Sequence, residues 1–150
     1  MIEQAVQTER LGYQFYFGMA DRFKKDDGLR QLFETLGEKE LAHEKRFRNL
    51  KEAKGLVELE GWEEASQYLR AIVESEFFLG KYKSLPELEN VNSIEAAVNF
   101  AIGFEKETLL YFHALRDLLK EKDIVDAIIT EEKSHLLWLS AFRKELMKRR

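Results

Sequence analysis

The chain has no cysteine, one proline and only eight glycines among its 150 residues. Without cysteine it cannot form disulfides, thiolate metal sites, iron–sulfur clusters or a cysteine nucleophile. The proline and glycine residues are too few to punctuate the many short strands of a β-sandwich or barrel. The composition therefore favours long helices.

Basic charge and long apolar runs are scarce as well. A net charge of −4 and a pI of about 5.5 argue against nucleic-acid binding, which usually needs a basic face. The longest uncharged runs, such as residues 11–20, are about half as long as the roughly 20 residues of a membrane span. No signal peptide is expected near the first residue, because Glu3, Glu9 and Arg10 interrupt the apolar pattern there. We therefore expect a soluble cytoplasmic protein that binds neither nucleic acid nor membrane.

Four segments carry apolar residues at the three- and four-residue steps of an amphipathic helix. Polar breaks at residues 24–28 and 120–123 separate the first segment from the second and the third from the fourth. Aspartate and asparagine at the starts of helices are typical caps, and the sequence predicts such caps at Asp27, Asn92 and Asp123. The four predicted helices run from Ile2 to Phe23, from Leu29 to Leu50, from Ile94 to Leu119 and from Val125 to Leu146.

A connection over about residues 54–92 separates the second helix from the third. It holds the only proline, Pro86, and a further helical pattern from Trp62 to Phe77. A long crossover of this kind joins two helical hairpins in one class of four-helix bundle. The sequence thus predicts a single all-α domain over residues 1–150, with a short helix in its crossover. The aromatic surface of that helix favours a homodimer.

The two predicted hairpins resemble each other weakly. Glu9 precedes Tyr16 by seven positions, as Glu105 precedes Phe112. The spacing Glu-x-x-His also occurs once in each hairpin and places both side chains on one helical face. Since glutamate occupies 22 of 150 positions, a single such motif would mean little. The doubled motif is what favours a shared site.

Six polar residues interrupt the apolar stripes where a helix facing the core would carry leucine or isoleucine. An unpaired buried carboxylate costs several kcal/mol, and no lysine or arginine stands in the stripes to pair with it. Two divalent cations would neutralise four carboxylates, and two neutral imidazoles would complete the coordination. The sequence therefore predicts a dinuclear metal site formed by Glu9, Glu40, His43, Glu105, Glu132 and His135.

The register of the helices supports this interpretation. In an antiparallel pair, Glu9 and His43 lie at equal height if the turn falls at their midpoint, position 26, which is in the first polar break. The midpoint of Glu105 and His135 lies in the second break. Each partner glutamate is therefore expected beside the histidine of the helix that follows it.

At these residues the sequence resembles the ferritin-like superfamily, and most closely its rubrerythrin-like di-iron branch. The resemblance covers nearly the whole chain and is carried by residues 8–16, 37–43, 101–112 and 129–136. It implies a ferritin-like four-helix bundle that binds two iron ions, with manganese or zinc as alternative metals. It implies terminal ligands Glu9 and Glu105, bridging ligands Glu40 and Glu132, and one histidine on each ion, His43 and His135.

The resemblance also bears on the surroundings of the site. Tyr16 matches a tyrosine common beside such sites, where it hydrogen-bonds a ligand or acts as a redox partner, although a structural role fits the sequence equally well. Full-length rubrerythrins carry a cysteine-rich module that supplies electrons, so this cysteine-free chain would need an external electron donor. Thr108 replaces a carboxylate of their third helix, which puts their particular peroxide cycle in doubt. Leu41 replaces the haem-binding methionine of bacterioferritins, so no haem is implied.

The predicted function is that of a non-haem di-iron oxidoreductase that reduces peroxide or O₂, with oxidation of Fe(II) as a coupled reaction. The spacing predicts the dinuclear site, and the resemblance implies the activity. A non-catalytic iron, manganese or zinc carrier is the alternative, and a metal-free helical scaffold is a third interpretation.

Other prominent residues have simpler interpretations. His113 lies off the apolar stripe, and Glu107 is expected in solvent on another face of its helix. The charged residues of 38–48, other than the predicted ligands, indicate an ordinary solvated face with local ion pairs. Aromatic side chains such as Trp62 and Trp138 favour packing or dimer contacts over a substrate pocket.

Overall fold

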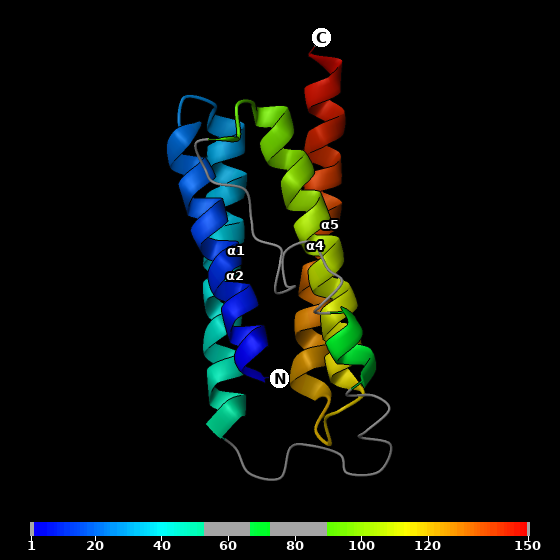
Figure 1. Ribbon diagram of the computed structural model, residues 1–150. Coiled ribbons are helices and arrows are strands. Elements are labelled where there is room, and N and C mark those ends of the chain that lie inside the picture. Colours follow the sequence, from blue (N-terminus) through cyan, green and yellow to red (C-terminus); the bar gives the residue numbers. More distant parts are fainter. Residues whose placement is uncertain (1, 53–66, 73–89, 150) are drawn as a thin grey trace.

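The structure, a computed structural model, describes residues 2–52, 67–72 and 90–149. Within these residues four long helices run side by side along one axis (Figure 1). Residues 67–72 are also helical. The long helices are α1 (Ile2–Arg22), α2 (Asp27–Glu52), α4 (Ile94–Arg116) and α5 (Asp123–Lys148).

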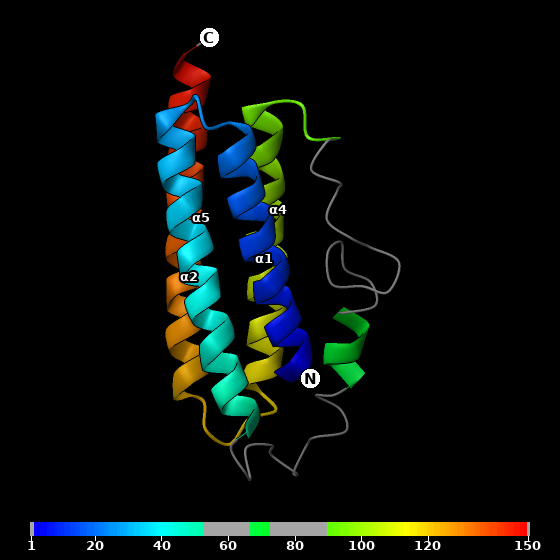
Figure 2. The same cartoon turned by 90° about the vertical axis from the view of Figure 1, so that its left-hand side faces the viewer.

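The helices form two antiparallel hairpins. α1 packs mainly against α2, and α4 mainly against α5, with smaller contacts from α1 to α4 and from α2 to α5. α2 ends at the lower end of the bundle and α4 begins at the upper end (Figure 1). The segment at 67–72 lies beside the lower end of α1 (Figure 2), where Leu69 and Ile72 are buried. These features confirm the predicted all-α bundle of two hairpins joined by a crossover with a short helix.

The two turns fall where the polar breaks were predicted, but the caps do not. α2 is capped by Asp26, whose carboxylate accepts a 2.9 Å hydrogen bond from the Leu29 N–H. α4 is capped by Ser93, whose hydroxyl accepts from the Ala96 N–H at 3.0 Å. α5 has Lys122 at this position, without a side-chain cap. All three predicted caps were therefore wrong by one residue. At α2 and α4 two adjacent side chains have suitable chemistry and the path of the turn selects between them, whereas α5 already includes Asp123 as its first residue.

The apolar core is divided into two clusters along the bundle axis. The lower cluster includes Phe47, Phe112 and Leu115, and the upper cluster includes Phe15 and Phe33. In each long helix, the candidate metal ligands lie in sequence between the residues of the two clusters. The core thus consists of two apolar layers with a polar layer between them.

None of the described helices has the length and the apolar character that a membrane span requires.

Candidate metal centre

The structure brings all six predicted ligands together in the polar layer between the two apolar clusters. α1 and α4 each contribute one glutamate, and α2 and α5 each contribute a Glu-x-x-His pair, because the three-residue spacing puts both side chains on the inner face. None of the six is exposed by more than 1%. They are Glu9, Glu40, His43, Glu105, Glu132 and His135.

The six side chains form two overlapping groups of four. Glu40 and Glu132 belong to both groups, Glu9 and His43 complete the first, and the remaining two residues complete the second. The candidate ligand atoms of each group lie within 4.8 Å of one another. Two ligands on opposite sides of one ion lie about 4 Å apart, since metal–oxygen and metal–nitrogen distances are about 2.1 Å. Small movements would therefore bring each group around one ion, with Glu40 and Glu132 between the two ions.

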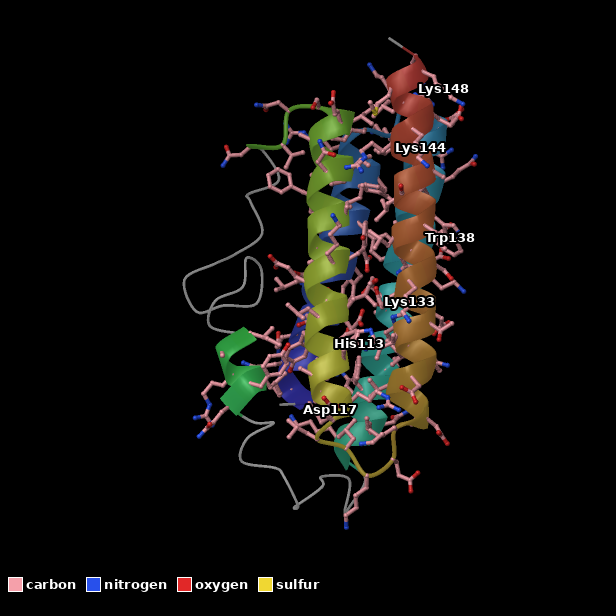
Figure 3. All side chains as sticks on the ribbon, turned by 90° about the vertical axis from the view of Figure 1, so that its right-hand side faces the viewer. His113, Asp117, Lys133, Trp138, Lys144 and Lys148 are labelled. Carbon is pink, nitrogen blue, oxygen red and sulfur yellow. The ribbon has the colours of Figure 1, made fainter. Side chains whose placement is uncertain are left out.

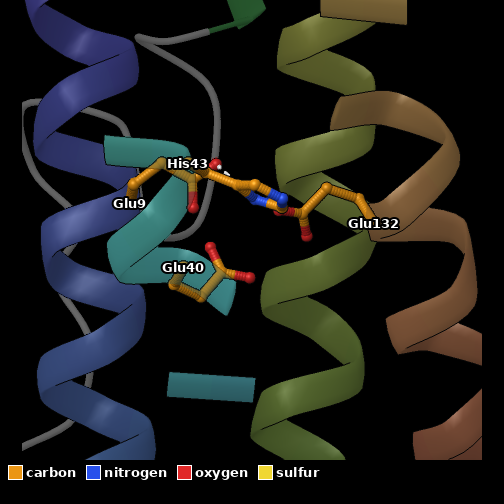
Figure 4. Close-up of side chains that lie close together, drawn as sticks. All are labelled: Glu9, Glu40, His43 and Glu132. Atoms are coloured by element: carbon orange, nitrogen blue, oxygen red, sulfur yellow. Dashed lines mark hydrogen bonds and ion pairs between the residues drawn. The ribbon is translucent and has the colours of Figure 1, made fainter. Parts of the chain in front are cut away.

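Both imidazoles direct Nδ1 towards the carboxylates. Nδ1 of His43 lies 2.8 Å from Oε1 of Glu132 and 3.6 Å from Oε1 of Glu9 (Figure 4). Nδ1 of His135 lies 3.2 Å from Oε1 of Glu40, 3.3 Å from Oε2 of Glu132 and 3.6 Å from Oε1 of Glu105. The two rings are nearly parallel, with centroids 5.8 Å apart. The convergence of carboxylate oxygens on one nitrogen of each ring is the arrangement that a shared cation would use.

Many of these buried polar atoms have no hydrogen-bond partner among the described residues. A buried polar atom without a partner is costly and calls for an explanation, and two divalent cations would satisfy the whole set. Carboxylate and imidazole ligands suit iron and manganese, so the donor set fits the pair of ions that the resemblance implied. The unpartnered atoms include both oxygens of Glu9 and Glu40, Oε2 of Glu105 and of Glu132, and both ring nitrogens of His135.

The pKa values show how the cluster balances its charge without metal. Burial, reinforced by the charge of Glu40, raises the pKa of Glu9 well above its ordinary value. Burial and the charge of Glu132 raise the pKa of Glu105 to about 8. Burial alone would lower the pKa of an imidazole, but the surrounding carboxylates raise that of His43 and raise that of His135 to about 12. Protons on these groups therefore offset charge that bound cations would otherwise neutralise.

Tyr16 lies beside the cluster. Its hydroxyl donates a 2.5 Å hydrogen bond to Oε1 of Glu105. Burial and the charge of Glu105 raise the pKa of the phenol well above its usual range, so the tyrosine remains a hydrogen-bond donor. The corresponding residue of the other hairpin is Phe112, which cannot donate a hydrogen bond.

Glu131, which the sequence interpretation did not single out, contacts the site, and Arg46, which it assigned to a solvated face, contacts Glu131. Oε2 of Glu131 lies 3.1 Å from Nε2 of His43 and accepts a 2.6 Å hydrogen bond from Arg46. A carboxylate that accepts from the outer nitrogen of a histidine fixes the ring and makes its inner nitrogen a better ligand. The available signal was the doublet Glu131-Glu132, in which Glu131 directly precedes the second Glu-x-x-His motif.

Gly12 is a further residue that the sequence interpretation did not single out. A Cβ atom at this position would lie 3.2 Å from Oε2 of Glu40 and 3.0 Å from Cε1 of Phe104. Both distances are shorter than ordinary van der Waals contact. The glycine therefore leaves room for the Glu40 carboxylate, and its position three residues after Glu9 was the signal available in the sequence.

The residues given simpler interpretations are placed as follows. His113 is exposed and Glu107 is half-buried. The solvated face predicted around residues 38–48 is wrong for Glu44, which is 4% exposed and accepts hydrogen bonds from Arg10 and Arg48. Trp138 is 42% exposed, and its ring centroid lies 5.6 Å from that of His135. Trp62 and Phe77 lie outside the described residues.

Comparison with known proteins supports the fold. The chain is similar to the crystal structure of a Thermotoga maritima protein that is provisionally assigned as a ferritin-like diiron-carboxylate protein. The TM-score is 0.72 and the sequence identity 22%, over 96% of this chain and 92% of that one. No protein-family model and no curated protein sequence matches the chain. At this identity the similarity establishes the fold, which is ferritin-like.

Fold and site together define a class. The protein is a ferritin-like helical bundle whose buried glutamate and histidine cluster fits two metal ions. The assignment to the rubrerythrin-like branch is a finer statement, and it remains a prediction.

Proposed function

We propose that the protein is a non-haem di-iron oxidoreductase that reduces peroxide or O₂, with oxidation of Fe(II) as a coupled reaction. The observation that carries this proposal is the pair of overlapping ligand groups that share Glu40 and Glu132. A single-ion site has no need of two such groups. Two adjacent iron ions, when bound, would supply two electrons, which is the number that reduction of an oxygen–oxygen bond requires.

Each side chain has a definite part in this proposal. Glu9 and His43 would hold one ion, Glu105 and His135 would hold the other, and Glu40 and Glu132, which belong to both groups, would serve both. Tyr16 keeps the Glu105 carboxylate in place through its 2.5 Å hydrogen bond. The apolar clusters above and below the site limit the access of water, which strengthens the attraction between carboxylates and cations.

The electrons for repeated turnover come from outside this cysteine-free chain. An external electron donor is therefore the proposed partner. The proposal includes no haem, since Leu41 occupies the position of the haem-binding methionine of bacterioferritins.

Anaerobic reconstitution with Fe(II) tests the proposal. We expect two iron ions per chain, rapid oxidation on addition of peroxide when followed optically, and return to the reduced state when a chemical reductant is added. Glu40→Gln should abolish the two-iron stoichiometry, because this residue belongs to both groups. Glu38→Gln, at an exposed position on the same helix, should bind and react as the unmodified protein does.

Two results would contradict the oxidoreductase. Stoichiometric uptake of metal without oxidation by peroxide would leave the metal carrier. A melting temperature that a chelator does not change, with no metal bound after reconstitution, would leave only a helical scaffold.

A further inference from the structure

The two histidines of the cluster differ in what lies behind them. Nε2 of His43, the ring nitrogen that points away from the cluster, lies 3.1 Å from the carboxylate of Glu131. That carboxylate is held in turn by Arg46, at 2.6 Å. Nε2 of His135 is buried and has no hydrogen-bond partner among the described residues. One imidazole is therefore oriented from both sides, and the other only from within the cluster.

The sequence shows that this difference is built into the chain. Glu131 directly precedes the glutamate of its Glu-x-x-His motif, and the residue that precedes Glu40 is Lys39. Arg46 follows His43 by three positions, and the residue that follows His135 by three positions is Trp138. Trp138, labelled on α5 in Figure 3, presents an aromatic ring where the other half has a guanidinium group. Lys39 and Trp138 have no carboxylate, so neither can accept a hydrogen bond from the outer N–H of an imidazole.

The two glutamates that each belong to a single ligand group, Glu9 and Glu105, also differ in their hydrogen bonds. Oε1 of Glu105 accepts a hydrogen bond from Tyr16, which draws negative charge away from that carboxylate. Both oxygens of Glu9 lack a hydrogen-bond partner among the described residues. A carboxylate that accepts no hydrogen bond from the protein is a stronger ligand for a cation than one that does, and an imidazole whose outer N–H meets a carboxylate is a more basic ligand. Both differences strengthen the half formed with Glu9 and His43.

We propose that the two halves of the metal centre bind metal unequally, and that the half formed by Glu9 and His43 fills first because Glu131 and Arg46 orient His43. This inference rests on the dinuclear site of the proposed function, and not on its reaction. Glu131 is a positioning residue, since it acts through His43. Loss of such an outer partner costs about 10- to 100-fold in metal affinity, so the difference between the halves is expected in that range.

The test locates the first metal ion directly. Protein is loaded anaerobically with one equivalent of Co(II), which accepts carboxylate and imidazole ligands, and crystals are measured at the cobalt absorption edge. We expect anomalous density beside His43 to exceed that beside His135 by about tenfold or more. Occupancy of each half is the decisive readout. Two identical halves that share bridging ligands would also bind the first and second ion with different affinities, but the first ion would then be divided equally between them.

Glu131→Gln should shift the cobalt towards equal occupancy of the two halves. Glu131 is partly exposed, with 39% of its side chain accessible, so the variant should fold, and the melting temperature of the metal-free form checks that it does. Glu145→Gln is the matched control, because it removes an exposed carboxylate from the same helix. It should leave the preference for the His43 half unchanged.

The outcomes separate this inference from the proposed function. Equal filling, filling of the His135 half first, or a preference that Glu131→Gln does not change would overturn the inference and leave the dinuclear site standing. Absence of cobalt from both halves would overturn the site itself, and the inference with it.

Discussion

The Glu40 carboxylate lies beside a residue without a side chain, Gly12. Glycine inside a helix costs about 1 kcal/mol relative to alanine. Gly12 lies in the middle of α1, where the helix alone would favour alanine. The space beside Glu40 and Phe104 supplies the reason for the glycine.

We predict that Gly12→Ala weakens metal binding by about tenfold. The added Cβ atom would lie 3.2 Å from Oε2 of Glu40, so the carboxylate must move away from the position in which it lies between the two ligand groups. Calorimetric titration of the metal-free protein with Mn(II) measures the change. Helical content from circular dichroism should stay the same, since alanine favours the helix.

Gly28→Ala provides the control for this prediction. A Cβ atom there would lie 3.4 Å from its nearest neighbour, a carbon of Phe142, which is ordinary contact. The control should bind metal as the unmodified protein does. Equal affinity in both variants would show that the space beside Glu40 has no part in the site.

The cluster of six candidate ligands could be predicted from sequence because each is a polar residue at a position that should be apolar. Glu131 and Arg46 could not be identified in this way. A partly exposed glutamate and arginine are ordinary on the surface of a helix, and these two are 85 positions apart in the chain. Only the packing of α2 beside α5 brings them behind His43, and the apolar period of one helix contains no information on that contact.

At the scale of single helices, apolar periodicity placed the four long elements and their two turns. It did not place the caps, since Asp26 and Asp27 are equally suitable in sequence. The structure shows that the carboxylate of Asp26 accepts from the Leu29 N–H and also pairs with Arg149 at 3.1 Å. Asp27 is 82% exposed at its side chain and pairs with Arg30 at 3.5 Å.

We predict that Asp26→Ala lowers the free energy of unfolding by about 1 kcal/mol, through loss of the N-cap hydrogen bond. Asp27→Ala, the neighbouring substitution, should cost no more than about 0.5 kcal/mol, because an exposed ion pair contributes little. Urea denaturation of the two variants measures both values. A larger loss for Asp27→Ala would mean that α2 begins one residue later than the structure shows.

At the scale of the molecule, the fold class followed from the length and order of the helical segments, and the long connection between the second and third helices indicated the crossover. The division of the core into two apolar clusters with a polar layer between them was implicit in the positions of the six polar residues. The unequal metal binding of the two halves was not implicit in the sequence pattern, because the weak repeat suggests two equivalent hairpins. It depends on single positions, such as Lys39 and Trp138, where the repeat fails.

The whole polar layer should make the stability of the metal-free protein depend on pH. Glu9 and Glu105 have pKa values raised by burial, the latter to about 8, so the folded state binds protons that the unfolded state has released above about pH 4.5. The raised pKa values of His43 and His135 act in the same direction above about pH 6.5. The folded state therefore holds more protons than the unfolded state over this range, and stability must fall as the pH rises.

We predict that the melting temperature of the metal-free protein decreases steadily from pH 5 to pH 8. Each proton of difference changes the free energy of unfolding by up to about 1.4 kcal/mol per pH unit. Glu131, whose pKa is lowered by Arg46 and His43 in spite of its partial burial, has the opposite dependence, but it acts only below about pH 4.5. Thermal melts in the presence of a chelator, in buffers of matched ionic strength, measure the slope.

Metal should reverse this dependence, because cations and protons compete for the same atoms. The stabilisation that Mn(II) gives should grow from pH 5 to pH 8, and binding at neutral pH should release protons, which calorimetry in buffers of different ionisation enthalpy can count. Glu105 and His135, with pKa values of about 8 and about 12, must each give up a proton at neutral pH. Binding without proton release, or metal stabilisation that shrinks as the pH rises, would show that the metal lies elsewhere than among these buried groups.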